Sequence, residues 1–297
     1  MEQVVEYLPL LAWLVAAGVG AGLMAGLLGV GGGIVMVPAM AAVFQIIGMP
    51  DEIIMHVAVA TSLAVIVPTG LSSARSHAKR GAVAKDLLIM WAPAMVIAAF
   101  VGGVTAGFYS AQVMSLIFGV MAFFIAVNSV VPIQQKLMGN LGDSKPTHSI
   151  SAAFIGYISS LMGIGGGSLS VPTMTALGRP VHTAVGTSSA LGVFIALPAA
   201  VGFIISGWSV AGVPAFSIGY ISLPAMASLA IGAIVFAPVG AMIAHKLSAV
   251  LLKRVLAVYL LIVSARMILK AIGGEGAWRA LTLDYCSISH CTDTVMV

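Results

Sequence analysis

Three long stretches of this 297-residue chain contain no Asp, Glu, Lys or Arg; they cover residues 7–50, 87–135 and 180–244. A membrane-spanning helix needs about 20 mainly apolar residues, so each stretch is long enough for more than one span. The whole chain is only 7% charged, whereas a soluble domain carries about 25% charged residues. The sequence therefore predicts an all-α polytopic membrane protein surrounded by the lipid bilayer.

Two glycine-rich motifs interrupt this apolar sequence, at residues 29–38 and 163–172. Each motif has glycine at its first, third, fourth and fifth positions and proline at its tenth. Because a glycine inside a helix costs about 1 kcal/mol relative to alanine, a regular helix is poorly supported across either motif. Paired breaks in corresponding apolar segments are typical of a transport site.

A second motif is also repeated, as His56-Val-Ala-Val-Ala-Thr-Ser62 and His182-Thr-Ala-Val-Gly-Thr-Ser188. It follows the glycine motif in both halves, which indicates an internal duplication. We therefore divide the chain into four parts. These are residues 1–133 as a first transmembrane repeat, 134–149 as a cytoplasmic linker, 150–272 as a second transmembrane repeat and 273–297 as a polar tail without a counterpart.

The distribution of Lys and Arg predicts the orientation in the membrane, because basic loops stay in the cytoplasm. Residues 75–85 form the most basic segment and are expected to be a cytoplasmic loop. About five membrane segments per half, an odd number, make the two repeats inverted. After the first motif, residues 34–47 give a helix of about 21 Å, which is shorter than the ~30 Å hydrocarbon core. Because the repeats are inverted, the two glycine motifs approach from opposite faces of the membrane, whether they cross it fully or re-enter.

Broken helices expose backbone N–H groups, and the N-terminus of a helix favours an anion. Glycines also let a ligand approach the backbone, because no Cβ atom intervenes. The alternative is close packing of two helices, but packing asks for a spacing of four residues, and these glycines are contiguous. The candidate backbone donors for an anion are Gly31, Gly32, Gly33, Gly165, Gly166 and Gly167.

The second motif adds paired polar side chains. Hydroxyl groups can bond an oxyanion, and a histidine can attract it or titrate near neutral pH. Alternatively, the hydroxyls bond the backbone of their own helix and the histidines cap loops. The candidates are His56, Thr61, Ser62, His182, Thr187 and Ser188.

Other polar groups give no sign of catalysis. The apolar body offers no carboxylate pair, cysteine or metal cluster, so we expect no enzyme activity, no cofactor and no metal. Both cysteines, Cys286 and Cys291, lie in the tail with His290, at a spacing that is not typical of zinc sites. Asn128, Gln45 and Tyr157 are expected to form hydrogen bonds between helices. The net charge of +4 comes from loops and does not indicate a nucleic-acid partner.

The two repeated motifs together resemble the sulfite exporter TauE/SafE family of permeases, over about residues 8–270. The resemblance implies transport of sulfite or small organosulfur anions, usually in the bacterial inner membrane. A negative cell interior drives an anion outward by about 2.3 kcal/mol per charge and 100 mV. Coupled transporters often use intramembrane carboxylates, which this chain lacks, so export is favoured. The alternatives are an uptake permease coupled to protons or sodium, and a membrane scaffold subunit without transport activity.

Overall fold

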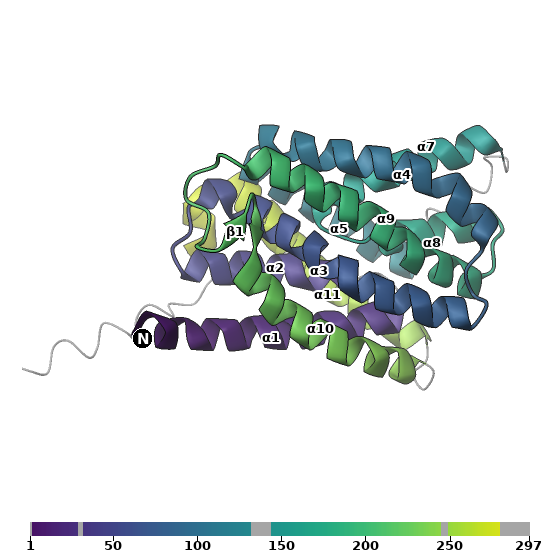
Figure 1. Cartoon of the computed structure of the whole chain (residues 1–297), viewed down its shortest axis with the longest axis horizontal. Helices are drawn as coiled ribbons and strands as arrows, with labels where there is room; N and C mark the ends of the chain where they lie inside the picture. Colours follow the sequence, from purple (N-terminus) through teal and green to yellow (C-terminus); the bar gives the residue numbers. More distant parts are fainter. Residues whose placement is uncertain (1, 29–31, 132–143, 245–248, 280–297) are drawn as a thin grey trace, which may run out of the picture.

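The chain folds into helices joined by short turns, as seen in a computed structural model that describes residues 2–28, 32–131, 144–244 and 249–279 (Figure 1). The first half contains α1 (Glu2–Leu28), α2 (Gly33–Ile46), α3 (Asp51–Lys79), α4 (Lys85–Thr105), the 3-10 turn η1 (Ala106–Phe108) and α5 (Ala111–Val130). The second half contains α7 (Lys145–Met162), α8 (Gly167–Ala176), α9 (Val181–Gly207), the short strands β1 (Ser217–Ile218) and β2 (Ile221–Ser222), α10 (Leu223–Ala244) and α11 (Ala249–Arg279). Most of the predicted linker and tail, with both cysteines, lies outside the described residues.

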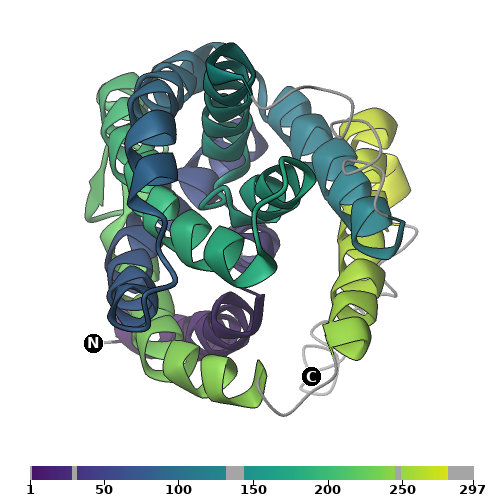
Figure 2. The ribbon, with the colours of Figure 1, turned by 90° about the vertical axis from the view of Figure 1, so that its right-hand side faces the viewer.

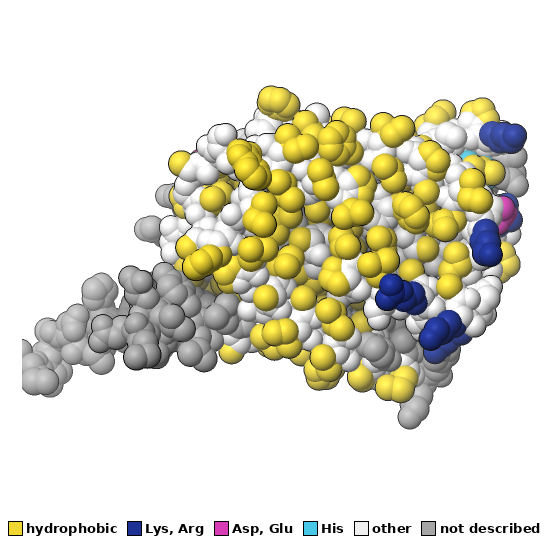
Figure 3. All heavy atoms as spheres, in the orientation of Figure 1, with side chains coloured by type: hydrophobic (Ala, Val, Ile, Leu, Met, Phe, Trp, Pro, Cys, Tyr) yellow, Lys and Arg dark blue, Asp and Glu magenta, His cyan; other side chains and the backbone are white. Residues whose placement is uncertain are grey.

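Five helical stretches of the described part are long and apolar enough to cross a membrane. They are Asp51–Lys79, Lys85–Phe108, Ala111–Val130, Val181–Gly207 and Arg254–Ile272. Hydrophobic side chains cover the face that Figure 3 shows, and the Lys and Arg side chains gather at one end of it. The prediction of an all-α polytopic membrane protein is therefore confirmed.

The helices of the two halves are interleaved. Helix α1 of the first half packs on α10 of the second half. Correspondingly, α7 of the second half packs on α4 of the first half. The central helices α3 and α9 pack on each other, as do the last helices α5 and α11. Viewed from the end that carries the basic side chains, these pairs surround the middle of the molecule (Figure 2). Corresponding helices thus make corresponding contacts.

Small residues allow the closest of these contacts. Gly18 and Gly22 of α1 lie directly against the backbone of Leu229 and Ala233 of α10. A Cβ atom on Gly22 would lie only 2.6 Å from the Ala233 carbonyl oxygen. Glycines spaced four residues apart on one helix face let two backbones approach in this way.

Helix α3 differs from the expected loop at residues 75–85, because it continues to Lys79. Asp51 and Glu52 lie in its first turn, and His77 and Lys79 lie in its last. Acidic groups at the start and basic groups at the end stabilise a helix through its dipole. The longer helix thus carries basic side chains at its C-terminal end. We call this part of the molecule the basic end; it includes the side chains of Arg75, Lys79, Arg80 and Arg179.

Candidate functional site

Both glycine motifs break a helix in the structure. Gly32 precedes α2 and Gly166 precedes α8, with φ angles of 33° and 73°. Glycine adopts this left-handed conformation without the penalty of a Cβ atom. Neither helix start is capped by a side chain. Gly31 lies outside the described residues.

The two motifs meet inside the molecule. The backbone of Gly33 lies directly against the carbonyl of Gly163, and a Cβ atom on Gly33 would overlap that oxygen. From this contact, α2 runs for 14 residues and α8 for 10, or about 21 Å and 15 Å. The chain after α2 reaches Asp51, which pairs with Lys270, whereas the chain after α8 reaches Arg179 at the basic end. The motifs therefore meet between the two ends of the molecule.

The surroundings of the two motifs differ in polarity. A Cβ atom built on Gly166 would lie 3.5 Å from the Ser159 hydroxyl and 3.6 Å from the Ser170 hydroxyl. A Cβ atom on Gly32 would instead meet the Met36 methyl at 2.9 Å and the backbone and methyl group of Ala21. Among the atoms nearest to each built Cβ atom, hydroxyl oxygens thus occur at Gly166 and not at Gly32.

Four buried serine hydroxyls near the second motif have no hydrogen-bond partner in the described part of the protein. They are Ser159, Ser168, Ser170 and Ser188. Of these, the sequence interpretation selected only Ser188. The signal for the others is the comparison of the repeats, because Ser168 and Ser170 stand where the first motif has Ile34 and Met36.

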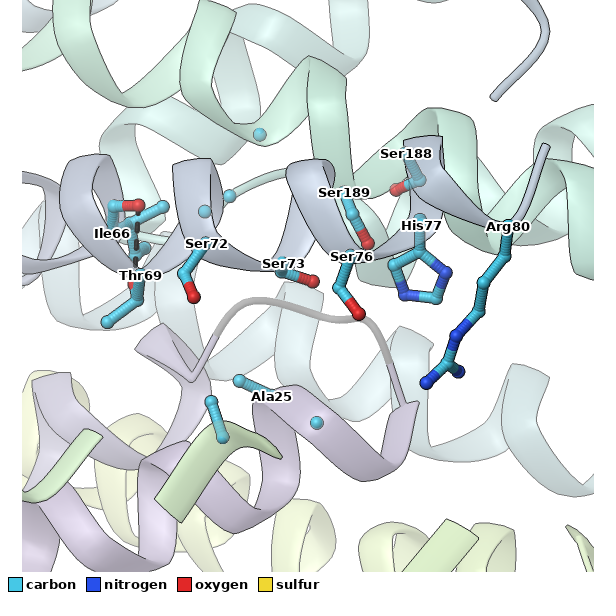
Figure 4. A pocket seen from close by; sticks show the side chains of 15 residues that line it. Ala25, Ile66, Thr69, Ser72, Ser73, Ser76, His77, Arg80, Ser188 and Ser189 are labelled. Carbon is cyan, nitrogen blue, oxygen red and sulfur yellow. Dashed lines mark hydrogen bonds between the residues drawn. The ribbon is translucent and has the colours of Figure 1, made fainter. Parts of the chain in front are cut away.

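A cavity of about 90 Å³ leads from the basic end to the second motif (Figure 4). Serine and threonine hydroxyls of α3 and α9 line it, and His77 and Arg80 stand at one end of it. The lining residues are Ala25, Gly26, Ile66, Thr69, Gly70, Ser72, Ser73, Ser76, His77, Arg80, Gly165, Ser188, Ser189, Gly192 and Ala237. Of the predicted site residues, the cavity thus brings Gly165 and Ser188 together.

A second, wider hollow adjoins this cavity. Its lining includes Ser72 and Ser76, which also line the first cavity, together with Arg75 and Lys79. None of the described residues that line the two hollows is acidic. The positive charges of Arg75, Lys79 and Arg80 raise the local concentration of anions.

The two predicted threonines have matching structural roles. The Thr61 hydroxyl accepts a 3.0 Å hydrogen bond from the backbone N–H of Ser222, directly before α10. The Thr187 hydroxyl accepts a 2.9 Å bond from the N–H of Ala84, directly before α4. Each threonine therefore fixes the start of a helix in the other half of the chain.

The corresponding serines differ. Ser62 is fully buried and donates to the Gly163 carbonyl over 2.8 Å. Ser188, its counterpart in the second half, lines the cavity instead.

The two predicted site histidines, His56 and His182, are not among the residues that line the cavity. The Nε2 atom of His56 lies 3.1 Å and 3.0 Å from the carbonyl oxygens of Ala106 and Tyr109, and its ring stacks on Tyr220. His56 therefore joins α3 to the turn between α4 and α5. His182 is exposed in the first turn of α9.

The expected hydrogen bonds of Tyr157 between helices are confirmed. Its hydroxyl lies 2.8 Å from that of Tyr109 and 3.2 Å from that of Thr105. The bond to Tyr157 is the main cause that raises the pKa of Tyr109, and burial adds to it. Gln45 accepts a 3.5 Å bond from Lys270 of α11. Within the described residues, no group of three His, Cys, Asp or Glu is placed to hold a metal.

Comparison with known proteins places the chain in a family. The family described as "Sulfite exporter TauE/SafE" matches residues 14–267. A probable membrane transporter protein of Haemophilus influenzae is 33% identical over 250 residues, which cover 84% of this chain and 95% of the relative. One from Methanocaldococcus jannaschii is 27% identical over 77% of this chain and 84% of its own length. A third, YunE of Bacillus subtilis, is 32% identical over 65% of this chain and 78% of its own.

No solved structure matches the chain. The family match covers most of the sequence, and the relatives carry the name of membrane transporters. With its apolar helices, the protein is a multi-pass membrane protein. It belongs to the sulfite exporter TauE/SafE family of membrane transporters.

Proposed function

We propose that this protein exports small sulfur-containing anions, such as sulfite or organosulfonates, and has no enzyme activity. The observation that carries the proposal is the hydroxyl-lined cavity that leads from the basic end to Gly165 of the second broken helix. Hydroxyl and backbone N–H groups are the donors that an oxyanion needs. Arg80 supplies positive charge at the mouth of the cavity.

The size of the cavity fits a small ion. Its volume of about 90 Å³ exceeds the roughly 10–15 Å³ that one water molecule needs. It is well below the roughly 300–1,000 Å³ of pockets for drug-sized ligands. A polyatomic anion with one sulfur atom therefore fits the inner cavity, whereas the adjoining hollow of about 340 Å³ also admits larger ions.

Export follows from the charge distribution. The positive-inside rule assigns the basic end to the cytoplasm, so the cavity opens toward the negative side of the membrane. A divalent anion that leaves gains about 4.6 kcal/mol at 100 mV, twice the value for one charge. At the opposite end, the Lys270 ammonium pairs with the Asp51 carboxylate at 3.3 Å, which neutralises both groups.

The internal relations of the fold support two inverted repeats, at residues 1–133 and 150–272. Helices α2 and α8 lead from the contact of the two motifs to opposite ends of the molecule. The bonds of Thr61 to Ser222 and of Thr187 to Ala84 are counterparts. The repeats then provide two related glycine motifs for the anion path.

Flux across reconstituted vesicles tests this function. The purified protein is placed in vesicles loaded with sulfite, sulfate, thiosulfate or methanesulfonate, and a potassium gradient with valinomycin sets the membrane potential. We expect sulfite or sulfonate movement that accelerates when the potential drives anions across and that needs no proton or sodium gradient. Flux that requires such a gradient would identify a coupled uptake permease. No flux of any of these anions, with the protein correctly folded, would favour a scaffold subunit and overturn the proposal.

A further inference from the structure

We propose that the anion binds at the start of α8, between the hydroxyls of Ser159 and Ser170 and the backbone at Gly166, and not at the start of α2. This inference deepens the proposed function by assigning its binding site to one of the two glycine motifs. It rests on the different chemistry of two helix starts that the sequence repeat makes equivalent.

Two buried hydroxyls face the start of α8. Ser159 and Ser170 are 1% and 0% exposed, and neither hydroxyl has a partner among the described residues. Both lie close to the Cα atom of Gly166, at 3.5 Å and 3.6 Å from a Cβ atom built there, and the Cδ1 atom of Ile195 lies on the same side. A buried hydroxyl without a partner is costly, and a bound oxyanion would satisfy both hydroxyls at once.

The backbone at the same place offers further donors. The first N–H groups of a helix have no acceptor within the helix, and no side chain caps α8. With 10 residues, α8 is long enough for its dipole to favour a negative charge at this end. The two serine hydroxyls and the first N–H groups of α8 therefore lie at the same helix start.

The start of α2 has different side-chain surroundings, although its N-cap glycine is also left-handed. Met36 and Ala21 surround Gly32, and Ser62 of the neighbouring helix already donates to the Gly163 carbonyl. A Cβ atom on Gly33 would overlap that same carbonyl, so this glycine serves close packing. The hydroxyls of Ser62 and Tyr259, described beside the first motif, donate to the carbonyls of Gly163 and Ile34, and the first motif supports the second.

The cavity approaches the proposed site along one face of α9. Ser188, Gly192 and Ile195 are spaced four and three residues apart, so they share a helix face. Ser188 and Gly192 line the cavity, and the Cδ1 atom of Ile195 lies against Gly166. Because this atom is the flexible end of a side chain, a change of the Ile195 rotamer makes room at Gly166.

Equilibrium binding of potassium sulfite to the purified protein, measured by calorimetry in detergent, tests the site independently of flux. Ser159→Ala and Ser170→Ala are each expected to weaken sulfite binding roughly tenfold to a hundredfold, the effect of losing a hydrogen bond to a charged group. Ser159→Thr and Ser170→Thr keep the hydroxyl and are expected to retain most of the affinity. Ser228→Ala is the matched control, because this buried hydroxyl bonds its own helix at Pro224.

Thermal unfolding of the same samples shows that each variant is folded. Wild-type affinity in folded Ser159→Ala and Ser170→Ala proteins would overturn the site, even if vesicles carry sulfite flux. The same titrations are repeated with sodium gluconate. If Ser159→Ala and Ser170→Ala weaken sodium binding but leave sulfite binding unchanged, the hydroxyls hold a cation and the proposed anion site is wrong. Absence of sulfite binding to the folded wild-type protein would also overturn the site. If the serine variants lose affinity but wild-type vesicles show no flux, the site stands and the transport function fails.

Discussion

The Ser62 hydroxyl donates a 2.8 Å hydrogen bond to the carbonyl of Gly163, and so α3 of the first half holds the glycine motif of the second. Ser188, the counterpart of Ser62, lines the cavity that opens toward the basic end. Two buried residues at equivalent positions thus have different surroundings: Ser62 bonds a backbone carbonyl, whereas Ser188 borders the cavity. This difference is what a carrier requires if one side of its central site is sealed while the other is accessible.

Loss of the Ser62 hydroxyl is expected to destabilise the protein. Ser62→Ala leaves the buried Gly163 carbonyl without this donor, which costs about 1–3 kcal/mol. Ser129→Ala is the control, because Ser129 bonds the Ile125 carbonyl of its own helix. Unfolding of both variants in detergent gives the comparison, and equal stability of Ser62→Ala and wild type would show that the bond between the motifs does not hold them together.

The contact of Gly33 with Gly163 leaves no space for a side chain. Gly33→Ala is expected to cost about 1–3 kcal/mol or more, because the new methyl group must displace backbone. Gly20→Ala is the matched control, since its Cβ atom would lie an ordinary 3.8 Å from Val35. The alanine at position 20 is expected to be neutral or to stabilise α1 by up to about 1 kcal/mol. Equal melting temperatures for the two variants would contradict the close packing of the motifs.

The two threonines predict a symmetric pair of effects. Thr61→Val and Thr187→Val each remove the acceptor for a backbone N–H at a helix start. Each is expected to lower the free energy of unfolding by about 1–3 kcal/mol, because the N–H group is left without an acceptor, whereas Thr→Ser at the same positions retains the bond. The measurement is chemical unfolding of the four variants in detergent. A threonine-to-serine loss as large as the valine loss would mean that packing, and not the hydrogen bond, decides the effect.

Cysteine labelling tests which serine faces the cavity. Both native cysteines, Cys286 and Cys291, lie in the tail and are first replaced by serine. In that background, Ser72→Cys, at an exposed position that lines both hollows, is expected to react at least about tenfold faster than Ser62→Cys with a charged thiosulfonate reagent, because position 62 is fully buried. The protein is reconstituted into vesicles, and protease cleavage at Arg80 shows on which side of the vesicle membrane the basic end lies. Equal labelling of both cysteines would contradict the one-sided opening.

Much of the fold follows from local sequence signals. The break before α2 and its short length were predicted from contiguous glycines, and the observed helix of Gly33–Ile46 agrees with the expected residues 34–47 within one residue. The repeated motifs also predicted that the two halves contain corresponding elements. These signals depend only on hydrophobicity, spacing and backbone conformation, which a single sequence contains.

The candidate site follows less directly, because it depends on packing between distant helices. Thr61 and Ser62 have the same residue types as Thr187 and Ser188, yet only Ser188 reaches the cavity. Part of the cavity wall on α3, at Ser76 and His77, lies in the segment expected to be a loop, into which that helix continues. Ser159 of α7 became a candidate only when the structure placed it beside Gly166.

Crystals soaked in selenite provide the most direct test of the central claim that the anion binds at the start of α8. Selenite has the shape and charge of sulfite, and its selenium atom is located by anomalous diffraction. The predicted result is a selenium peak within hydrogen-bond reach of Ser159 and Ser170, lost in the Ser159→Ala Ser170→Ala double variant. A peak at Gly32 instead, or a peak at Gly166 that persists in the double variant, would contradict the claim.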